Sequence, residues 1–142
     1  MALPESTYIS EKEYLVLDAD SDMRYEYEDG KIIAMAGASR EHNLIKSNVH
    51  INIGNQLRNR LCEIYQSDMR VQIAKQSSYR YPDIVVVCGE PLFADTKPVS
   101  LINPTLVIEV LSASTEDRDY RQKSLEYRNM LSIQEYVIIS HK

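Results

Sequence analysis

Residues 106–111 read LVIEVL, so that one glutamate, Glu109, stands among five apolar residues. The apolar and β-branched character of Thr105 to Leu111 predicts a central, buried strand. Asp83 to Cys88 repeats this character directly after Tyr81-Pro82, and a proline is tolerated where a strand begins. We therefore expect the centre of the fold to hold two buried strands that each carry an acidic residue.

The chain has 142 residues and a mass of 16.4 kDa, with 44% apolar and 26% charged residues. This predicts one soluble globular domain that can bury a core without disulfides or a structural metal. Cys62 and Cys88 show no CxxC spacing, so we expect reduced thiols rather than a disulfide or a zinc cluster. The N-terminus lacks the features of a secretory signal and no apolar run approaches ~20 residues, which favours a cytoplasmic protein with no membrane contact.

The net charge is -5, from 16 basic and 21 acidic residues. Such a balance argues against a protein that coats nucleic acid or anionic membrane through bulk electrostatic attraction. Contact with nucleic acid at a specific site stays open.

Hydrophobic periodicity predicts a mixed α/β fold. We expect a capping box at Ser10 that opens a helix through Leu17, followed by a hairpin that turns at Asp29-Gly30. Beyond the hairpin and besides the two central strands, we expect a helix at 42–61, a strand at 64–74, a helix at 116–129 and a strand at 136–139. Residues 1–142 form a single domain, in which 1–38 supply the N-terminal helix and hairpin and 39–142 supply the core.

Glu109 is the most informative residue, because burying an unpaired carboxylate costs several kcal/mol. If the two central strands pair antiparallel so that Cys88 faces Pro104, the residue numbers of each opposed pair add to 192. Asp83 then faces Glu109, with Cβ atoms ~5 Å apart on one face of the sheet.

Two carboxylates this close repel each other unless a cation joins them. A small set of oxygen ligands suits Mg²⁺ or Mn²⁺ better than zinc, and supports metal-assisted phosphodiester hydrolysis. Two other interpretations stay open: Asp83 only begins a strand, or Glu109 is one half of a structural salt bridge.

Lys123 is the candidate catalytic cation. Asp119, Lys123 and Tyr127 share one face of the predicted helix, which could turn the Lys123 ammonium toward the carboxylates. It would orient water or offset charge on a phosphate. The alternative is a solvated surface lysine, in which case Arg121 is the next candidate.

These residues resemble the Uma-type restriction endonucleases of the PD-(D/E)xK nuclease superfamily. The likeness rests on residues 81–87, 103–112, Lys123 with Tyr127-Arg128, 24–30 and His42-Asn43, and so runs through nearly the whole chain. It implies a restriction-endonuclease-like core, in the order helix, three strands, helix, strand, behind an N-terminal helix and β-hairpin.

The resemblance also implies divalent-metal-dependent cleavage of DNA, with Asp83 and Glu109 as metal ligands. The superfamily's lysine position holds Leu111 here, which nominates Lys123 on the next helix. Glu26 matches an early acidic position of the family and either assists at the metal or holds the hairpin. His42 either touches the site or begins the helix, and we favour the helix.

Relatives usually continue beyond the last strand, so we expect an uncovered sheet edge and a homodimer. The leading functional hypothesis is a Mg²⁺- or Mn²⁺-dependent endodeoxyribonuclease. Two alternatives stay open: a non-catalytic interaction module with the same fold, and a phosphodiesterase acting on RNA or nucleotides.

Overall fold

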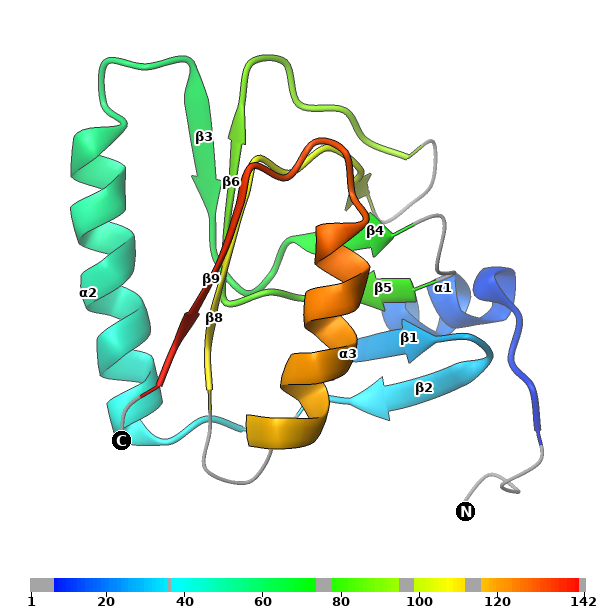
Figure 1. Cartoon of the computed structure of the whole chain (residues 1–142). Coiled ribbons are helices and arrows are strands. Elements are labelled where there is room, and N and C mark those ends of the chain that lie inside the picture. Colours follow the sequence, from blue (N-terminus) through cyan, green and yellow to red (C-terminus); the bar gives the residue numbers. More distant parts are fainter. Residues whose placement is uncertain (1–6, 36, 74–77, 95–98, 112–115, 141–142) are drawn as a thin grey trace.

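Helices and two β-sheets make up the part of the chain that the structure describes, which is residues 7–35, 37–73, 78–94, 99–111 and 116–140 of a computed structural model (Figure 1). The helices are α1 (Glu11–Asp20), α2 (Arg40–Gln56) and α3 (Glu116–Arg128). The strands are β1 (Tyr25–Glu28), β2 (Lys31–Ala34), β3 (Cys62–Tyr65), β4 (Arg70–Ile73), β5 (Ser78–Arg80), β6 (Ile84–Cys88), β7 (Ser100–Leu101), β8 (Leu106–Val110) and β9 (Glu135–Ile139). The mixed α/β class expected from the sequence is confirmed.

The N-terminal helix and hairpin form as their local signals predict. The Ser10 hydroxyl accepts a hydrogen bond from the Glu13 backbone N–H (3.1 Å) and caps α1. Asp29 and Gly30 turn the hairpin with positive φ angles of 40° and 88°. Strand β1 also pairs with β5, so the hairpin belongs to a five-stranded sheet in the order β2-β1-β5-β4-β7.

The second sheet has the order β3-β6-β8-β9. Strands β6 and β8 pair antiparallel, with Ile84 opposite Ile108 and Val86 opposite Leu106. In both pairs the two residue numbers add to 192, which is the register expected from the sequence. Because both strands are central in the sheet, nearly all of their side chains are buried.

Two expected boundaries are wrong. The strand expected at 64–74 is two strands in different sheets, because β3 ends at Tyr65 and residues 66–69 carry the chain across to β4. Helix α2 ends at Gln56 rather than near Leu61, and Leu61 is 88% exposed. The four-residue apolar spacing continues to Leu61 although Gly54 and Asn55 already weaken the helix.

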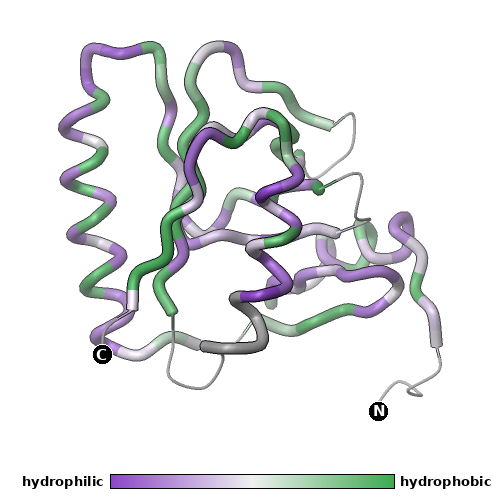
Figure 2. Tube along the Cα trace, viewed as in Figure 1, coloured by the Kyte–Doolittle hydropathy of each residue, from purple (hydrophilic) through white to green (hydrophobic). Residues whose placement is uncertain are grey.

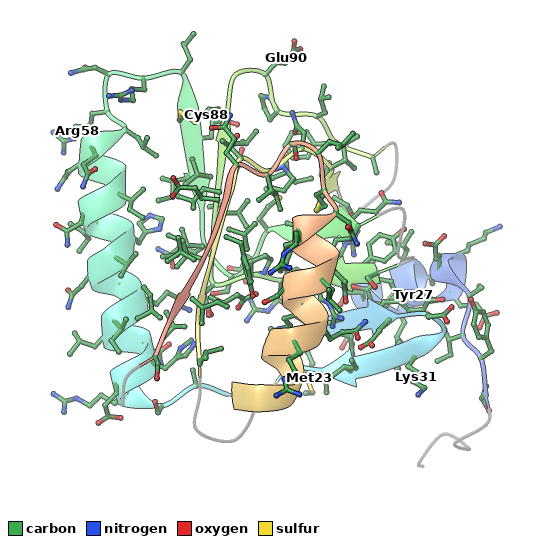
Figure 3. The ribbon with its side chains drawn as sticks, in the orientation of Figure 1. Met23, Tyr27, Lys31, Arg58, Cys88 and Glu90 are labelled. Carbon is green, nitrogen blue, oxygen red and sulfur yellow. A yellow bond between two sulfur atoms is a disulfide. The ribbon has the colours of Figure 1, made fainter. Side chains whose placement is uncertain are left out.

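The expectation of free thiols is also wrong, since Cys62 and Cys88 form a disulfide (Figure 3). Cys62 begins β3 instead of ending a helix, and it lies directly opposite Cys88 of β6. Their Cα atoms are 4.0 Å apart. The disulfide could not be predicted from the spacing of the two cysteines, because it depends on the register in which β3 pairs with β6.

The main core lies between the sheets and α3. It contains Val71, Ile73 and Leu101 from the five-stranded sheet, Val85, Val87 and Val107 from the four-stranded sheet, and Tyr127 from α3. Figure 2 shows apolar segments along β6, β8 and β9, whereas α2 alternates between polar and apolar residues. Among the described residues, no helix is long and apolar enough to cross a membrane.

Helices α2 and α3 lie on opposite sides of the four-stranded sheet (Figure 1). Side chains two residues apart on a strand share a face, so Asp83 and Glu109 point to the same face as Val85 and Val107. The two carboxylates therefore lie on the same face as the main core, beyond Val85 and Val107 at one end of the two strands.

Candidate active site

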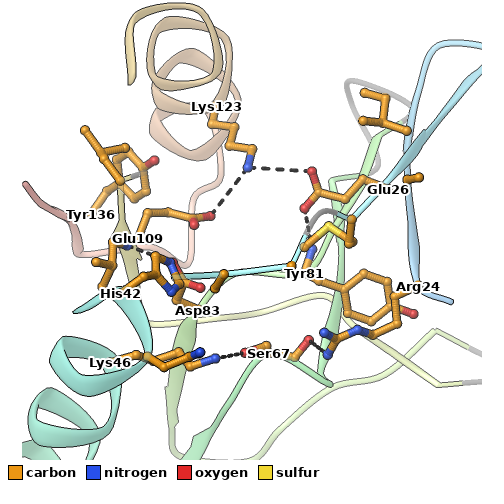
Figure 4. A pocket seen from close by; sticks show the side chains of 18 residues that line it. Arg24, Glu26, His42, Lys46, Ser67, Tyr81, Asp83, Glu109, Lys123 and Tyr136 are labelled. Atoms are coloured by element: carbon orange, nitrogen blue, oxygen red, sulfur yellow. Dashed lines mark hydrogen bonds and ion pairs between the residues drawn. The ribbon is translucent and has the colours of Figure 1, made fainter. Parts of the chain in front are cut away.

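A cavity of about 420 Å³ opens where the chain crosses between the two sheets (Figure 4). The chain crosses at residues 66–69, between β3 and β4, and again at residues 81–83, between β5 and β6. Both crossings contribute lining residues, and so do the β1–β2 hairpin with the segments on either side of it, α2, α3, the end of β8, and β9. The cavity thus collects side chains from segments that lie far apart in the sequence.

Asp83 stands at the second crossing, one residue before β6 begins. Its Oδ2 accepts a hydrogen bond from the Val110 backbone N–H at 2.7 Å. This contact ties the carboxylate to the end of β8, beside Glu109. Both the register and the hydrogen bond bring the two acidic residues together, as the sequence predicts.

Glu109 is buried in the cavity wall, and its side chain is 10% exposed. Its Oε1 has no hydrogen-bond partner among the described residues. Burial raises the pKa of Glu109 to about 8; Lys123 opposes the rise, while the Asp83 and Glu26 carboxylates add to it. The site therefore contains a buried carboxylate oxygen that a cation would satisfy.

Lys123 projects from α3 into the same cavity (Figure 4). Its Nζ is 4.0 Å from Glu109 Oε1 and 3.6 Å from Glu26 Oε1. Only 13% of the side chain is exposed, so Lys123 is not the solvated surface lysine that the helix composition allowed. Arg121, the alternative cation, is exposed. The side chain of Asp119 lies outside the described residues.

Glu26 is held through both of its oxygens. Its Oε2 accepts a hydrogen bond from the Tyr81 backbone N–H (2.8 Å), and its Oε1 lies 3.3 Å from Arg80 and 3.6 Å from Lys123. With these partners in place, Glu26 is better suited to orient Lys123 than to bind a metal. We call Asp83, Glu109, Lys123 and Glu26 the carboxylate site.

Arg80 pairs with Glu26 of this site, and it was not identified from the sequence. Its guanidinium is 2% exposed and contacts Glu26, Glu28 and Glu126. A buried cation shared among several carboxylates holds them at fixed positions, and removing it would leave them unpaired. The signal was available, because Arg80 directly precedes the Tyr81-Pro82-Asp83 motif at the end of a buried strand.

His42 both begins the helix and touches the site. The Ser39 hydroxyl accepts a hydrogen bond from the His42 backbone N–H, which caps α2. The His42 ring is buried with Nε2 3.4 Å from Asp83 Oδ2. The interpretation that we favoured from the sequence, in which His42 only begins the helix, therefore missed the contact of its ring with Asp83.

The part of the cavity opposite the carboxylate site is basic, and no sequence pattern indicated this. Lys46 of α2 donates a hydrogen bond to the Ser67 hydroxyl (2.7 Å), and Arg24 donates one to the Ser67 carbonyl (2.7 Å). Lys46 lies one helical turn after His42. Ser67 lines the cavity because the chain passes from one sheet to the other at this point, and no local sequence pattern predicts that crossing.

The donor set fits a small, oxygen-binding cation. The described residues contain no group of three or more His, Cys, Asp or Glu arranged to hold a metal, but they do contain the Asp83–Glu109 pair with its unpartnered oxygen. Mg²⁺ is commonly bound by one or two carboxylates and retains several waters. Two protein carboxylates are therefore sufficient for this type of site.

Comparisons with known proteins agree on the fold. The model of the Uma2 family, described as "Putative restriction endonuclease", matches residues 11–142. Two uncharacterized proteins of Synechocystis sp. are each 37% identical to this chain, over 139 and 133 residues. These matches cover 98% and 93% of this chain and 78% and 68% of the two relatives.

A solved structure shares the architecture. The crystal structure of a "putative nuclease belonging to DUF820" from Anabaena variabilis superimposes with a TM-score of 0.73, covering 93% of this chain and 74% of that one. The sequence identity is 21%. At this identity the likeness shows the fold, and the chemistry has to be argued from the site.

Proposed function

Since the chain belongs to the Uma2 family, we propose that it is a divalent-metal-dependent endonuclease that hydrolyses phosphodiester bonds of DNA. The observation that carries the proposal is the Asp83–Glu109 pair, in which the buried Glu109 Oε1 lies beside Lys123 and has no hydrogen-bond partner within the described part of the chain. This arrangement has the components needed for phosphodiester hydrolysis: oxygen ligands for a cation and a positive side chain next to them.

Asp83 and Glu109 would hold Mg²⁺ or Mn²⁺. When bound, such a cation acts as a Lewis acid toward the phosphate and lowers the pKa of bound water. The hydrogen bond from the Val110 backbone N–H keeps the Asp83 carboxylate oriented. A fixed carboxylate loses little freedom on binding, which favours a defined geometry.

Lys123 supplies the second part of the chemistry. Its ammonium lies between Glu109 and Glu26, so it can orient the attacking water or stabilise negative charge that develops on the phosphate. Glu26, itself held by Arg80 and the Tyr81 backbone, would act as a positioning residue for Lys123.

Cleavage of supercoiled plasmid DNA in Mg²⁺ or Mn²⁺ tests the proposal. We expect Asp83→Asn and Glu109→Gln to lower the rate by at least about 10³-fold, equivalent to about 4 kcal/mol of transition-state stabilisation. Glu90→Gln removes an exposed carboxylate away from the cavity (Figure 3) and should cleave at the wild-type rate. The proposal fails if the wild type cleaves no faster than Asp83→Asn.

The same assay separates the alternatives when RNA and dinucleotide substrates are run in parallel. Turnover of these substrates without cleavage of DNA would indicate a phosphodiesterase of different specificity. Absence of Mg²⁺ and Mn²⁺ binding in calorimetry, together with absence of cleavage, would indicate an interaction module that retains the fold.

We extend the proposal to a homodimer. Strand β9 is an edge strand of the four-stranded sheet within the described residues, and an edge strand exposes unpaired backbone groups that a second copy can satisfy. Sedimentation equilibrium should give twice the chain mass at micromolar concentration. A monomer mass across that range would contradict it.

A further inference from the structure

The basic part of the cavity has no role in the chemistry assigned to the carboxylate site. It consists of Lys46 and Arg24, which approach Ser67 from opposite directions (Figure 4). The two residues are 22 positions apart in sequence and come from α2 and from the segment before β1. We call Lys46, Arg24 and Ser67 the Ser67 cluster.

The Ser67 cluster is held in place and is only partly neutralised. Lys46 Nζ donates a hydrogen bond to the neutral Ser67 hydroxyl, and among the described residues no carboxylate lies within 4 Å of it. Arg24 pairs with Asp68, but the Asp68 side chain is 93% exposed, so solvent screens this pair. The cluster therefore presents positive charge to the cavity.

The geometry also leaves donors available to a ligand. An ammonium has three donors and a guanidinium has five, whereas the contacts to Ser67 and Asp68 use only Lys46 Nζ and Arg24 Nη1. The Arg24 guanidinium lies 5.7 Å from the centre of the Tyr81 ring, which restrains it by a cation–π contact. Half-buried, oriented donors of this kind match the unesterified oxygens of a phosphodiester.

The overall charge of -5 makes this cluster significant. A polynucleotide approaching an acidic protein needs local positive charge, and in protein–DNA complexes phosphate contacts fix the position of the strand. Because the Ser67 cluster and the carboxylate site line one cavity, a strand with one phosphate at the carboxylates could place another against Lys46 and Arg24.

We propose that the Ser67 cluster is a phosphate subsite, in which Lys46 and Arg24 bind the backbone phosphate next to the one that is cleaved. This inference rests on the proposed nuclease function and adds to it a requirement for a polynucleotide with a neighbouring phosphate. A minimal phosphodiester without that phosphate cannot use the subsite.

The kinetic test compares two substrates. Lys46→Gln keeps a donor for Ser67 but removes the charge, and Arg58→Gln removes a charge from the residue two positions after the end of α2, away from the cavity (Figure 3). For Lys46→Gln, we expect kcat/KM to fall roughly tenfold more on a DNA oligonucleotide than on bis(4-nitrophenyl) phosphate, as for loss of one charged hydrogen bond. Arg58→Gln should match the wild type on both. Equal losses on the two substrates, or none on the oligonucleotide, would overturn the subsite.

A binding measurement decides the question even if the protein does not cleave DNA. Fluorescence anisotropy with a 20-base-pair duplex in Ca²⁺ gives the dependence of affinity on salt concentration. Lys46→Gln should reduce the slope of log K against log salt by roughly 0.9, the value for one phosphate contact, and Arg24→Gln should act in the same direction. Slopes equal to that of Arg58→Gln would contradict the inference, whereas failure of cleavage alone would count against the proposed function.

Discussion

Two clusters of buried charge lie within this fold, and they differ in whether their polar atoms are partnered. Around Asp18, Oδ1 accepts a hydrogen bond from the Tyr25 backbone N–H (2.9 Å), while Oδ2 accepts from Arg70 (2.9 Å) and the Tyr81 hydroxyl. Arg70 also donates to Ser100 (2.7 Å). In the carboxylate site, by contrast, Glu109 Oε1 is buried without a hydrogen bond from any residue that the structure describes.

The difference indicates different roles for the two clusters. A buried ion pair whose hydrogen bonds are all made fixes one arrangement of the chain, and it leaves nothing for a ligand to satisfy. A buried carboxylate that lacks a partner is costly in the free protein, and a bound cation would relieve that cost. The contrast supports the proposal that the carboxylate site carries the chemistry, whereas the Asp18 cluster stabilises the fold.

The largest effect on stability should come from the Asp18 cluster. Arg70→Met removes the cation and leaves Asp18 as an unpaired buried charge, because both side chains are 1% exposed. We expect the free energy of unfolding to fall by about 3–5 kcal/mol in urea denaturation. Arg58→Met, at an exposed position, should change it by less than about 0.5 kcal/mol. A loss below about 1 kcal/mol for Arg70→Met would remove the distinction between the clusters.

The next effect concerns cleavage. Lys123→Ala should lower the rate by about 10²–10³-fold, as for loss of one oriented electrostatic group, and leave divalent-metal affinity nearly intact. Arg121→Ala, which removes an exposed cation from the same helix, should have little effect. Wild-type cleavage by Lys123→Ala would transfer the role to another cation, with Arg121 the next to examine.

The third effect is a pH dependence of stability in the metal-free protein. The raised pKa of Glu109, about 8 against an ordinary 4.5, means that the folded chain retains a proton that the unfolded chain has lost between these values. Stability should therefore fall as pH rises from about 4.5 to 8.

Glu109→Gln isolates this contribution. Measured in EDTA at pH 8.5, its melting temperature should exceed that of the wild type, and the difference should shrink toward pH 5. Glu90→Gln serves as the control because Glu90 is exposed. A difference that does not change with pH would show that burial of the Glu109 charge is not costly.

Local signals were sufficient to predict much of the fold. The Asp29-Gly30 turn, the last helix and the two central strands follow from short patterns, and the sum of 192 is confirmed by the pairing of Ile84 with Ile108. This register followed from supposing that the strands pair antiparallel with Cys88 facing Pro104, and the observed pairing has the same register.

The parts that were missed depend on distant contacts. Arg70 and Asp18 are 52 residues apart, and Arg80 and Glu26 are 54 apart, so neither buried pair has a local signature. The Cys62–Cys88 bond and the place of Ser67 in the cavity both follow from how β3 is paired and where it ends. Asp83 and Glu109 could be placed together because each is an acidic residue at or within an apolar strand, whereas Lys123 was nominated by its helix face and by the family resemblance.

A crystal structure obtained in Mn²⁺ tests the central claim most directly, because anomalous scattering locates the ion without reference to activity. We predict one site with oxygens of Asp83 and Glu109 at roughly 2.0–2.3 Å, the remaining positions filled by water, and Lys123 still beside Glu109. An ion bound elsewhere, or no ion at these carboxylates at millimolar Mn²⁺ and pH above 8, would contradict the account.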